Sequence, residues 1–167
     1  MPAAGRCEVL TYVLTLPTVS QEDLELLPLI ISGDILMALD QRLLGPVKKI
    51  YVYQPEQPPC SVTSFLNSVS DETAASYMKQ FEKHCAGHTL RGDRWHPLEE
   101  SLFEYKDNAS KSRIIHTTYP GHIQVLLYAF NGKKEDKIAE HHMIAARKLL
   151  QEFERRVDKL KKRRGKT

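Results

Sequence analysis

The spacing of apolar and polar residues divides most of the chain into short strands and amphipathic helices. Residues 49–53 are mostly β-branched or aromatic and precede a cluster of prolines, which predicts a strand that ends there. A short helix is expected over residues 61–69. Ser70 is placed to cap a second helix, in which apolar residues recur every three or four positions until Gly87. A strand followed by a helical hairpin is therefore the predicted start of the main domain.

The second half of the chain predicts three strands and a long helix, after a loop that contains Trp95 and Pro97. The three strand patterns cover residues 101–106, 112–119 and 122–130, and short turns separate them. The third pattern is apolar on both faces, so we expect this strand at the centre of the sheet. Residues 138–160 place their apolar side chains on one stripe and predict a C-terminal helix. The order of elements predicts an α+β fold, with a small antiparallel meander sheet, an N-terminal helical hairpin and a long C-terminal helix.

The first 46 residues carry a different pattern and no chemistry that we can name. An apolar run over 9–16 indicates a strand, and helices are expected to start at Ser20 and to cover 35–43. Gly45 and Pro46 then interrupt the pattern, so we place a domain boundary there. The predicted organisation is an extension of unknown role over 1–46, a main domain over 47–155 and a basic tail over 156–167.

The charges of the chain are unevenly distributed. It has 24 Lys and Arg residues against 21 Asp and Glu residues, a net charge of +3. Residues 1–46 hold two basic residues and six acidic ones, whereas residues 155–167 hold eight basic residues and one acidic. A basic segment of this kind attracts the phosphates of nucleic acids, and it suits equally well a solvated helix end that offsets the helix dipole.

Several classes of protein are disfavoured by the sequence. No segment reaches the ~20 apolar residues of a membrane helix, and Glu8 directly precedes the first apolar run, unlike the basic start of a secretory signal. The three cysteines are widely spaced, which favours reduced thiols over disulfides or a zinc site. The common motifs for nucleotide binding, serine hydrolases and zinc proteases are absent. We expect a cytoplasmic protein with no metal and no cofactor.

The candidate chemistry lies in cations at the strand ends. Lys106 ends the first strand of the meander, Arg113 opens the second, and Lys133, Lys134 and Lys137 follow the third. Antiparallel pairing is expected to gather these cations at one end of the sheet. Such a cluster can hold a phosphodiester and stabilise the charge that develops on its oxygens during RNA cleavage. The alternative is a set of ordinary strand-end cations in solvent.

The segments that carry these cations resemble the RelE/HigB superfamily of bacterial toxins, and its phage-associated HigB-type branch most of all. The segments are residues 96–106, with the run Leu102-Phe103-Glu104-Tyr105-Lys106, residues 112–115, and residues 125–130 with the paired lysines that follow. The likeness covers about residues 47–155 and leaves the first 46 without a counterpart. It implies a RelE-like fold. Members of the superfamily are ribosome-dependent endoribonucleases that cut mRNA in the decoding site and are neutralised by a cognate antitoxin protein.

The resemblance also implies roles for individual residues. It puts Arg113 at the family's phosphate-binding arginine, Lys106 at its basic strand-end position, and Lys134 at the basic position after the last strand. Glu104 stands where HigB-type sequences usually have a glutamate and RelE-type enzymes have a lysine implicated as a base. RelE-type enzymes carry a tyrosine in the final helix. Here His141 and His142 lie nearby, either imidazole can supply the proton relay, and His142 is our candidate catalytic residue. Further candidates for RNA contact are Lys133, Lys137, Arg155 and Arg156.

We therefore expect a phage-derived toxin of a type II toxin–antitoxin system that cuts mRNA without a metal, by attack of the RNA 2′-hydroxyl on the scissile phosphate. The expected partners are mRNA on the ribosome and a cognate antitoxin, with operator DNA bound only through the antitoxin and no membrane. One alternative is a non-catalytic protein of the same fold, such as a ParE-like gyrase inhibitor or an antitoxin-binding regulatory partner. Another is a phage-derived protein of this fold that has lost its activity. The set of Arg113, Lys106 and Lys134 favours the nuclease, because a gyrase inhibitor needs no cations around one phosphate.

Overall fold

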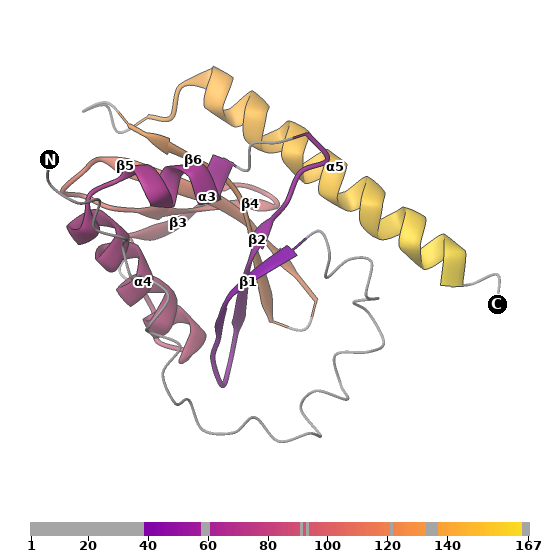
Figure 1. Cartoon of the computed structure of the whole chain (residues 1–167), viewed down its shortest axis with the longest axis horizontal. Coiled ribbons are helices and arrows are strands. Elements are labelled where there is room, and N and C mark those ends of the chain that lie inside the picture. Colours follow the sequence, from indigo (N-terminus) through magenta and orange to yellow (C-terminus); the bar gives the residue numbers. More distant parts are fainter. Residues whose placement is uncertain are drawn as a thin grey trace, which may run out of the picture. The chain divides into compact units, whose positions relative to one another are not determined.

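The computed structural model describes residues 39–57, 61–90, 92, 94–120, 122–132 and 137–164. These residues form a sheet of six strands together with three helices (Figure 1). The elements are β1 (Leu39–Leu44), β2 (Lys49–Tyr53), α3 (Ser61–Ser68), α4 (Asp71–Cys85), β3 (Trp95–Glu99), β4 (Leu102–Lys106), β5 (Ser112–Tyr119), β6 (Ile123–Asn131) and α5 (Glu140–Arg164). The strand predicted over 9–16 and the helix predicted from Ser20 lie outside the described residues.

The predicted α+β class is confirmed, but the sheet is mixed rather than a simple antiparallel meander. The strand order is β1-β2-β6-β5-β4-β3, and β2 runs parallel to β6 while the other neighbours are antiparallel. After β2 the chain passes through α3 and α4, re-enters at the far edge as β3, and returns strand by strand to β6. β6 therefore arrives beside β2 in the same direction, a pairing that needs such a long crossover. The predicted central position of this doubly apolar strand is confirmed.

Both edge strands differ from the sequence prediction. A helix was expected over 35–43, but residues 39–44 form β1, which pairs with β2. The expected boundary at Gly45 and Pro46 is consequently the turn of a hairpin inside the sheet. At the other edge, β3 occupies the expected loop around Pro97. Proline has no N–H to donate, and it is tolerated here because β3 has a neighbouring strand on one side only in the described sheet.

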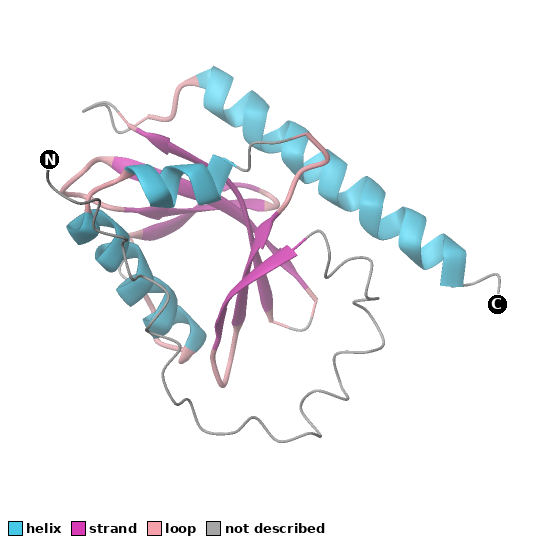
Figure 2. Ribbon diagram, viewed as in Figure 1, coloured by secondary structure: helices cyan, strands magenta, loops and turns pink. Residues whose placement is uncertain are grey.

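The three helices predicted after residue 60 are present, with small shifts at their ends. The hydroxyl of Ser70 caps α4 as expected, because its Oγ accepts the backbone N–H of Thr73 at 3.3 Å. α3 and α4 cover one face of the sheet and α5 covers the other (Figure 2). The core on the α4 side includes Ile50, Val52, Val62, Phe65, Tyr77, Phe81, Ile114 and Leu126. On the α5 side, Phe153 packs edge-on against Tyr53 and Tyr119.

Buried histidines and aromatic rings lie together on the α4 side of the sheet. His84 contacts Tyr105 Oη through Nδ1, at 2.5 Å, and Lys48 Nζ through Nε2. His116 stacks on the Tyr105 ring, and its Nε2 accepts the indole N–H of Trp95 at 3.0 Å. Burial lowers the pKa of His84 to about 4 and that of His116 to about 3. Both imidazoles are therefore neutral at neutral pH.

These lowered pKa values predict a loss of stability in mild acid. An unfolded histidine takes up a proton near pH 6.5, whereas the buried His116 does not until about pH 3. The free energy of unfolding should thus fall between pH 7.5 and pH 5, with about 2 kcal/mol from His116 alone. Urea titrations of the wild type and of His116→Gln at both pH values measure this contribution. The exposed-site variant His88→Gln should keep the full pH dependence, and an equally steep dependence in His116→Gln contradicts the assignment.

The β1–β2 hairpin is anchored to the C-terminal end of α4. The backbone N–H groups of Val47 and Lys48 donate to the carbonyl oxygen of Cys85 at 3.0 and 3.1 Å. This carbonyl belongs to the last turn of α4, where helices leave acceptors unpaired. Gly45 lies so close that a Cβ added to it would be 2.4 Å from Cys85 Cβ. The close approach of turn and helix therefore requires glycine at this position.

Gly45→Ala should destabilise the protein by about 1–3 kcal/mol, because the added methyl group forces the hairpin away from α4. Gly92→Ala is the matched control, since no described residue other than its chain neighbours lies within 4 Å of a Cβ added there. Thermal unfolding of the two variants, followed by circular dichroism, tests the difference. A Gly45→Ala variant as stable as Gly92→Ala would show that the hairpin does not need this contact.

Candidate functional site

The α5 face of the sheet carries two of the five predicted cations, Lys106 and Arg113, where β4, β5 and β6 lie side by side. Lys106 pairs with Arg113 across β4 and β5, and Arg113 pairs with Phe130 across β5 and β6. Direct partners in antiparallel strands project to the same face, so the three side chains form one row. The predicted pairing of Lys106 with Arg113 is thus confirmed. Arg113 is buried, whereas Lys106 is partly exposed.

The turn between β4 and β5 fixes this row in place. Asp107 accepts the hydroxyl of Ser76 from α4 at 2.7 Å, and it also accepts the backbone N–H of Ser110 at 2.9 Å. On the other side, the N–H of Gly132 donates to the carbonyl oxygen of Lys111 at 3.1 Å. A Cβ on Gly132 would lie only 2.2 Å from that oxygen, so the end of β6 approaches the turn as closely as glycine allows.

Arg113 forms a buried ion pair with Glu104 rather than facing solvent. Its Nη1 lies 3.0 Å from Oε1 and 2.9 Å from Oε2 of the carboxylate. The side chain of Glu104 is 0% exposed and that of Arg113 is 4% exposed. A second group, His96 on β3, places its Nε2 2.8 Å from Glu104 Oε1 and is 39% exposed. One buried carboxylate therefore lies between a guanidinium and an imidazole.

His142, near the start of α5, extends the site beyond β6. Its ring stacks on Phe130 with centroids 3.7 Å apart and an interplanar angle of 16°. Its Nδ1 lies 3.1 Å from Tyr128 Oη. Burial lowers the pKa of His142, and the neighbouring His141 lowers it further. Burial raises the pKa of Tyr128. A neutral imidazole and a protonated phenol therefore lie next to the row of Lys106, Arg113 and Phe130.

The arginines predicted to bind RNA on α5 lie away from this cluster. Arg156 donates to the carbonyl oxygen of Gln54 at 3.0 Å, and Arg155 pairs with Glu56 at 3.4 Å. At 1.5 Å per residue, Arg155 is about 20 Å along the helix from His142. These contacts join α5 to the segment after β2, which gives both arginines a structural role.

Of the remaining predicted lysines, Lys137 alone lies among the described residues. Lys137 is exposed, shortly before α5 begins. Lys133 and Lys134 lie outside the described residues. Of the predicted catalytic residues, the structure therefore brings together Lys106, Arg113, Glu104 and His142.

Sequence reasoning missed two members of the cluster. The sequence gives His96 no role, because a loop is expected around Trp95. Once β3 is recognised, its pairing puts His96 directly opposite Glu104. In the sequence, Phe130 marks only the end of an apolar strand pattern. The alternation within β6 puts it on the same face as Tyr128, a signal that could have marked both rings as neighbours of α5.

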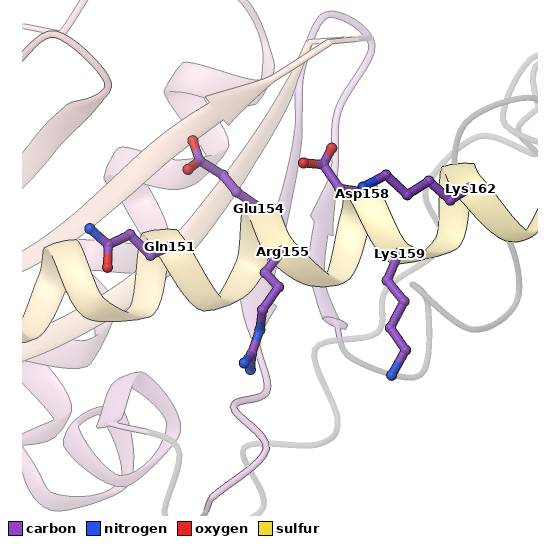
Figure 3. Close-up of a pocket in the computed structure, with 6 residues that line it drawn as sticks. All are labelled: Gln151, Glu154, Arg155, Asp158, Lys159 and Lys162. Carbon is purple, nitrogen blue, oxygen red and sulfur yellow. The ribbon is translucent and has the colours of Figure 1, made fainter.

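A shallow hollow farther along α5 offers no comparable chemistry. All its lining residues come from that one helix, with Arg155 and Lys159 pointing away from Glu154 and Asp158; the lining is Gln151, Glu154, Arg155, Asp158, Lys159 and Lys162 (Figure 3). Within the described ranges, no three His, Cys, Asp or Glu side chains are grouped to hold a metal ion. No described helix is both long and apolar enough to cross a membrane.

No protein-family model matches the chain, and no curated protein matches it significantly. The functional interpretation therefore depends on the geometry described above.

Glu104→Ala should destabilise the protein by about 3–5 kcal/mol, because it leaves the buried guanidinium of Arg113 without its counterion. Glu99→Ala is the matched control: it removes a carboxylate that pairs with Arg147 on the surface, where ion pairs contribute little. Chemical unfolding of both variants at neutral pH tests this. Equal stability of the two variants would show that the Glu104–Arg113 pair does not hold the strands together.

Proposed function

We propose that this chain is the toxin of a type II toxin–antitoxin system and cleaves mRNA on the ribosome. The observation that carries the proposal is the row of Lys106, Arg113 and Phe130 on one sheet face, with the imidazole of His142 stacked on its end. A cation, a guanidinium and a neutral imidazole are the groups needed to hold a phosphodiester and to move a proton next to it. Their arrangement along adjacent strands agrees with the resemblance to RelE/HigB toxins.

The reaction uses the 2′-hydroxyl of the RNA as its nucleophile. His142 accepts the proton of this hydroxyl at Nε2, while Tyr128 holds the ring through Nδ1. The 2′-oxygen forms a bond to phosphorus, the bond to the 5′-oxygen breaks, and the leaving oxygen takes a proton from water. Lys106 and Arg113 stabilise the extra negative charge on the phosphate oxygens. The products are a 2′,3′-cyclic phosphate and a 5′-hydroxyl.

The proposed partners of this chain are found in the cytoplasm. mRNA reaches the site while the ribosome holds the codon, and a cognate antitoxin protein neutralises the toxin. Operator DNA is contacted only through that antitoxin.

A second candidate function is a non-catalytic toxin of the same fold, such as a ParE-like gyrase inhibitor. One observation favours it: the side chain of Arg113 is only 4% exposed and its Nη1 contacts both oxygens of Glu104. A guanidinium engaged in this way has to leave its carboxylate before it can contact a phosphate. The two candidates differ in their effect on mRNA and on DNA topology.

Substitutions in the cluster separate the two functions. Lys106→Gln and His142→Gln should each lower mRNA cleavage about 10²-fold or more, because each removes a group that stabilises the transition state. Lys159→Gln, an exposed cation on α5, is the matched control and should cleave like the wild type. The measurement is a short pulse of expression in cells, followed by mapping of mRNA ends and by a readout of plasmid supercoiling. Intact mRNA with altered supercoiling would support the gyrase inhibitor instead.

A further inference from the structure

We propose that His96 is a positioning residue that balances the charge of Glu104 when Arg113 turns away to bind an RNA phosphate. The inference rests on the proposed function, since it concerns how the same site engages its substrate. It makes substrate binding depend on the uptake of one proton by His96.

The geometry sets Glu104 between two possible partners. His96 and Glu104 are direct partners across β3 and β4, and Arg113 reaches the same carboxylate from β5. Because the carboxylate accepts from Arg113 and carries negative charge, the His96 Nε2 that lies 2.8 Å away must donate its N–H. His96 Nδ1 is buried and has no hydrogen-bond partner among the described residues. In this arrangement the neutral imidazole is sufficient, because Arg113 already balances the charge of Glu104.

Binding of a phosphate by Arg113 changes this balance. The side chain of Arg113 is 4% exposed, so contact with a polymer requires its guanidinium to turn outward from Glu104. A fully buried carboxylate without a counterion is strongly unfavourable. His96 is in direct contact with that carboxylate, and its side chain is 39% exposed. The proton has to be taken up at Nδ1, which is buried in this arrangement, so the movement of Arg113 that admits the phosphate also has to admit water to Nδ1. The imidazolium then replaces the guanidinium as the partner of Glu104.

The other charged groups near His96 do not offer this exchange. Glu99, on the same strand, is paired with Arg147 of α5. Lys106 lies beyond Glu104 on β4, next to Arg113. On the described elements around it, Glu104 is the carboxylate that contacts His96 and Arg113 is the cation behind it.

The test measures RNA binding against pH. The probe is a mixed-sequence single-stranded RNA oligonucleotide with 2′-O-methyl groups, which cannot be cleaved, and its binding is followed by fluorescence anisotropy at fixed salt. Uptake of one proton should strengthen binding several-fold between pH 7.5 and pH 6, up to about tenfold per pH unit. His96→Gln should bind weakly with a reduced pH dependence. His96→Lys, which carries a permanent charge, should bind more tightly than His96→Gln at pH 7.5.

Control variants separate His96 from the other histidines. His88→Gln, at an exposed position just after the C-terminal end of α4, should keep the full pH dependence. His142→Gln should keep the part that His96→Gln loses. A wild type that does not bind the oligonucleotide, or a His96→Gln variant with an unchanged pH dependence, overturns the inference. Binding with the expected pH dependence by a protein that cuts no mRNA would remove the nuclease proposal and leave the role of His96 standing.

Discussion

The ion pair between Glu104 and Arg113 is the constraint on which the arrangement of the candidate site depends. Two charges that are almost fully shielded from water must stay in contact, because separating them leaves an uncompensated charge in the interior. The pair joins β4 to β5 at the level where β6 brings Phe130 to the same face. It thereby holds these strand ends in register. His96 contacts the pair from β3, and His142 stacks on Phe130 at the end of the row. The same contact keeps Arg113 away from solvent, so any phosphate must compete with Glu104 for it.

The two faces of the sheet use histidine in different ways, and strand alternation separates them. On the α4 side, His84 and His116 are enclosed by aromatic rings and remain neutral, so they contribute to the core. On the α5 side, His96 is partly exposed and lies beside a charged group, while His142 lies at the end of the cation row. A single strand contributes to both environments: on β4, Tyr105 packs toward α4 and Glu104 points to the opposite face. The proposed chemistry is thus confined to one face of the sheet, and the packing of the other face is independent of it.

Local signals in the sequence predict those elements whose secondary structure does not depend on pairing with another segment. The Ser70 cap, the apolar stripe of α5 and the doubly apolar β6 carry patterns strong enough to identify them. The edge strand β1 has leucines at helical spacing and no β-branched residue, and only its pairing with β2 makes it a strand. β3 contains Pro97, a residue that argues against a strand except at an edge. Parallel pairing of β2 with β6 joins segments about 70 residues apart, which no local pattern specifies.

The candidate site was partly predictable, because one of its contacts follows from a local hairpin. The hairpin connection alone predicts that Lys106 faces Arg113, and this pairing is present. The burial of Arg113 against Glu104 could not be foreseen, because it depends on how closely the described elements cover that end of the sheet. The central claim is that these side chains promote attack by the RNA 2′-hydroxyl. The chemical form of the new 3′ ends, after purified protein acts on ribosomes that translate a defined mRNA, tests it most directly. The account predicts 2′,3′-cyclic phosphates, and uncut mRNA or 3′-hydroxyl ends would contradict it.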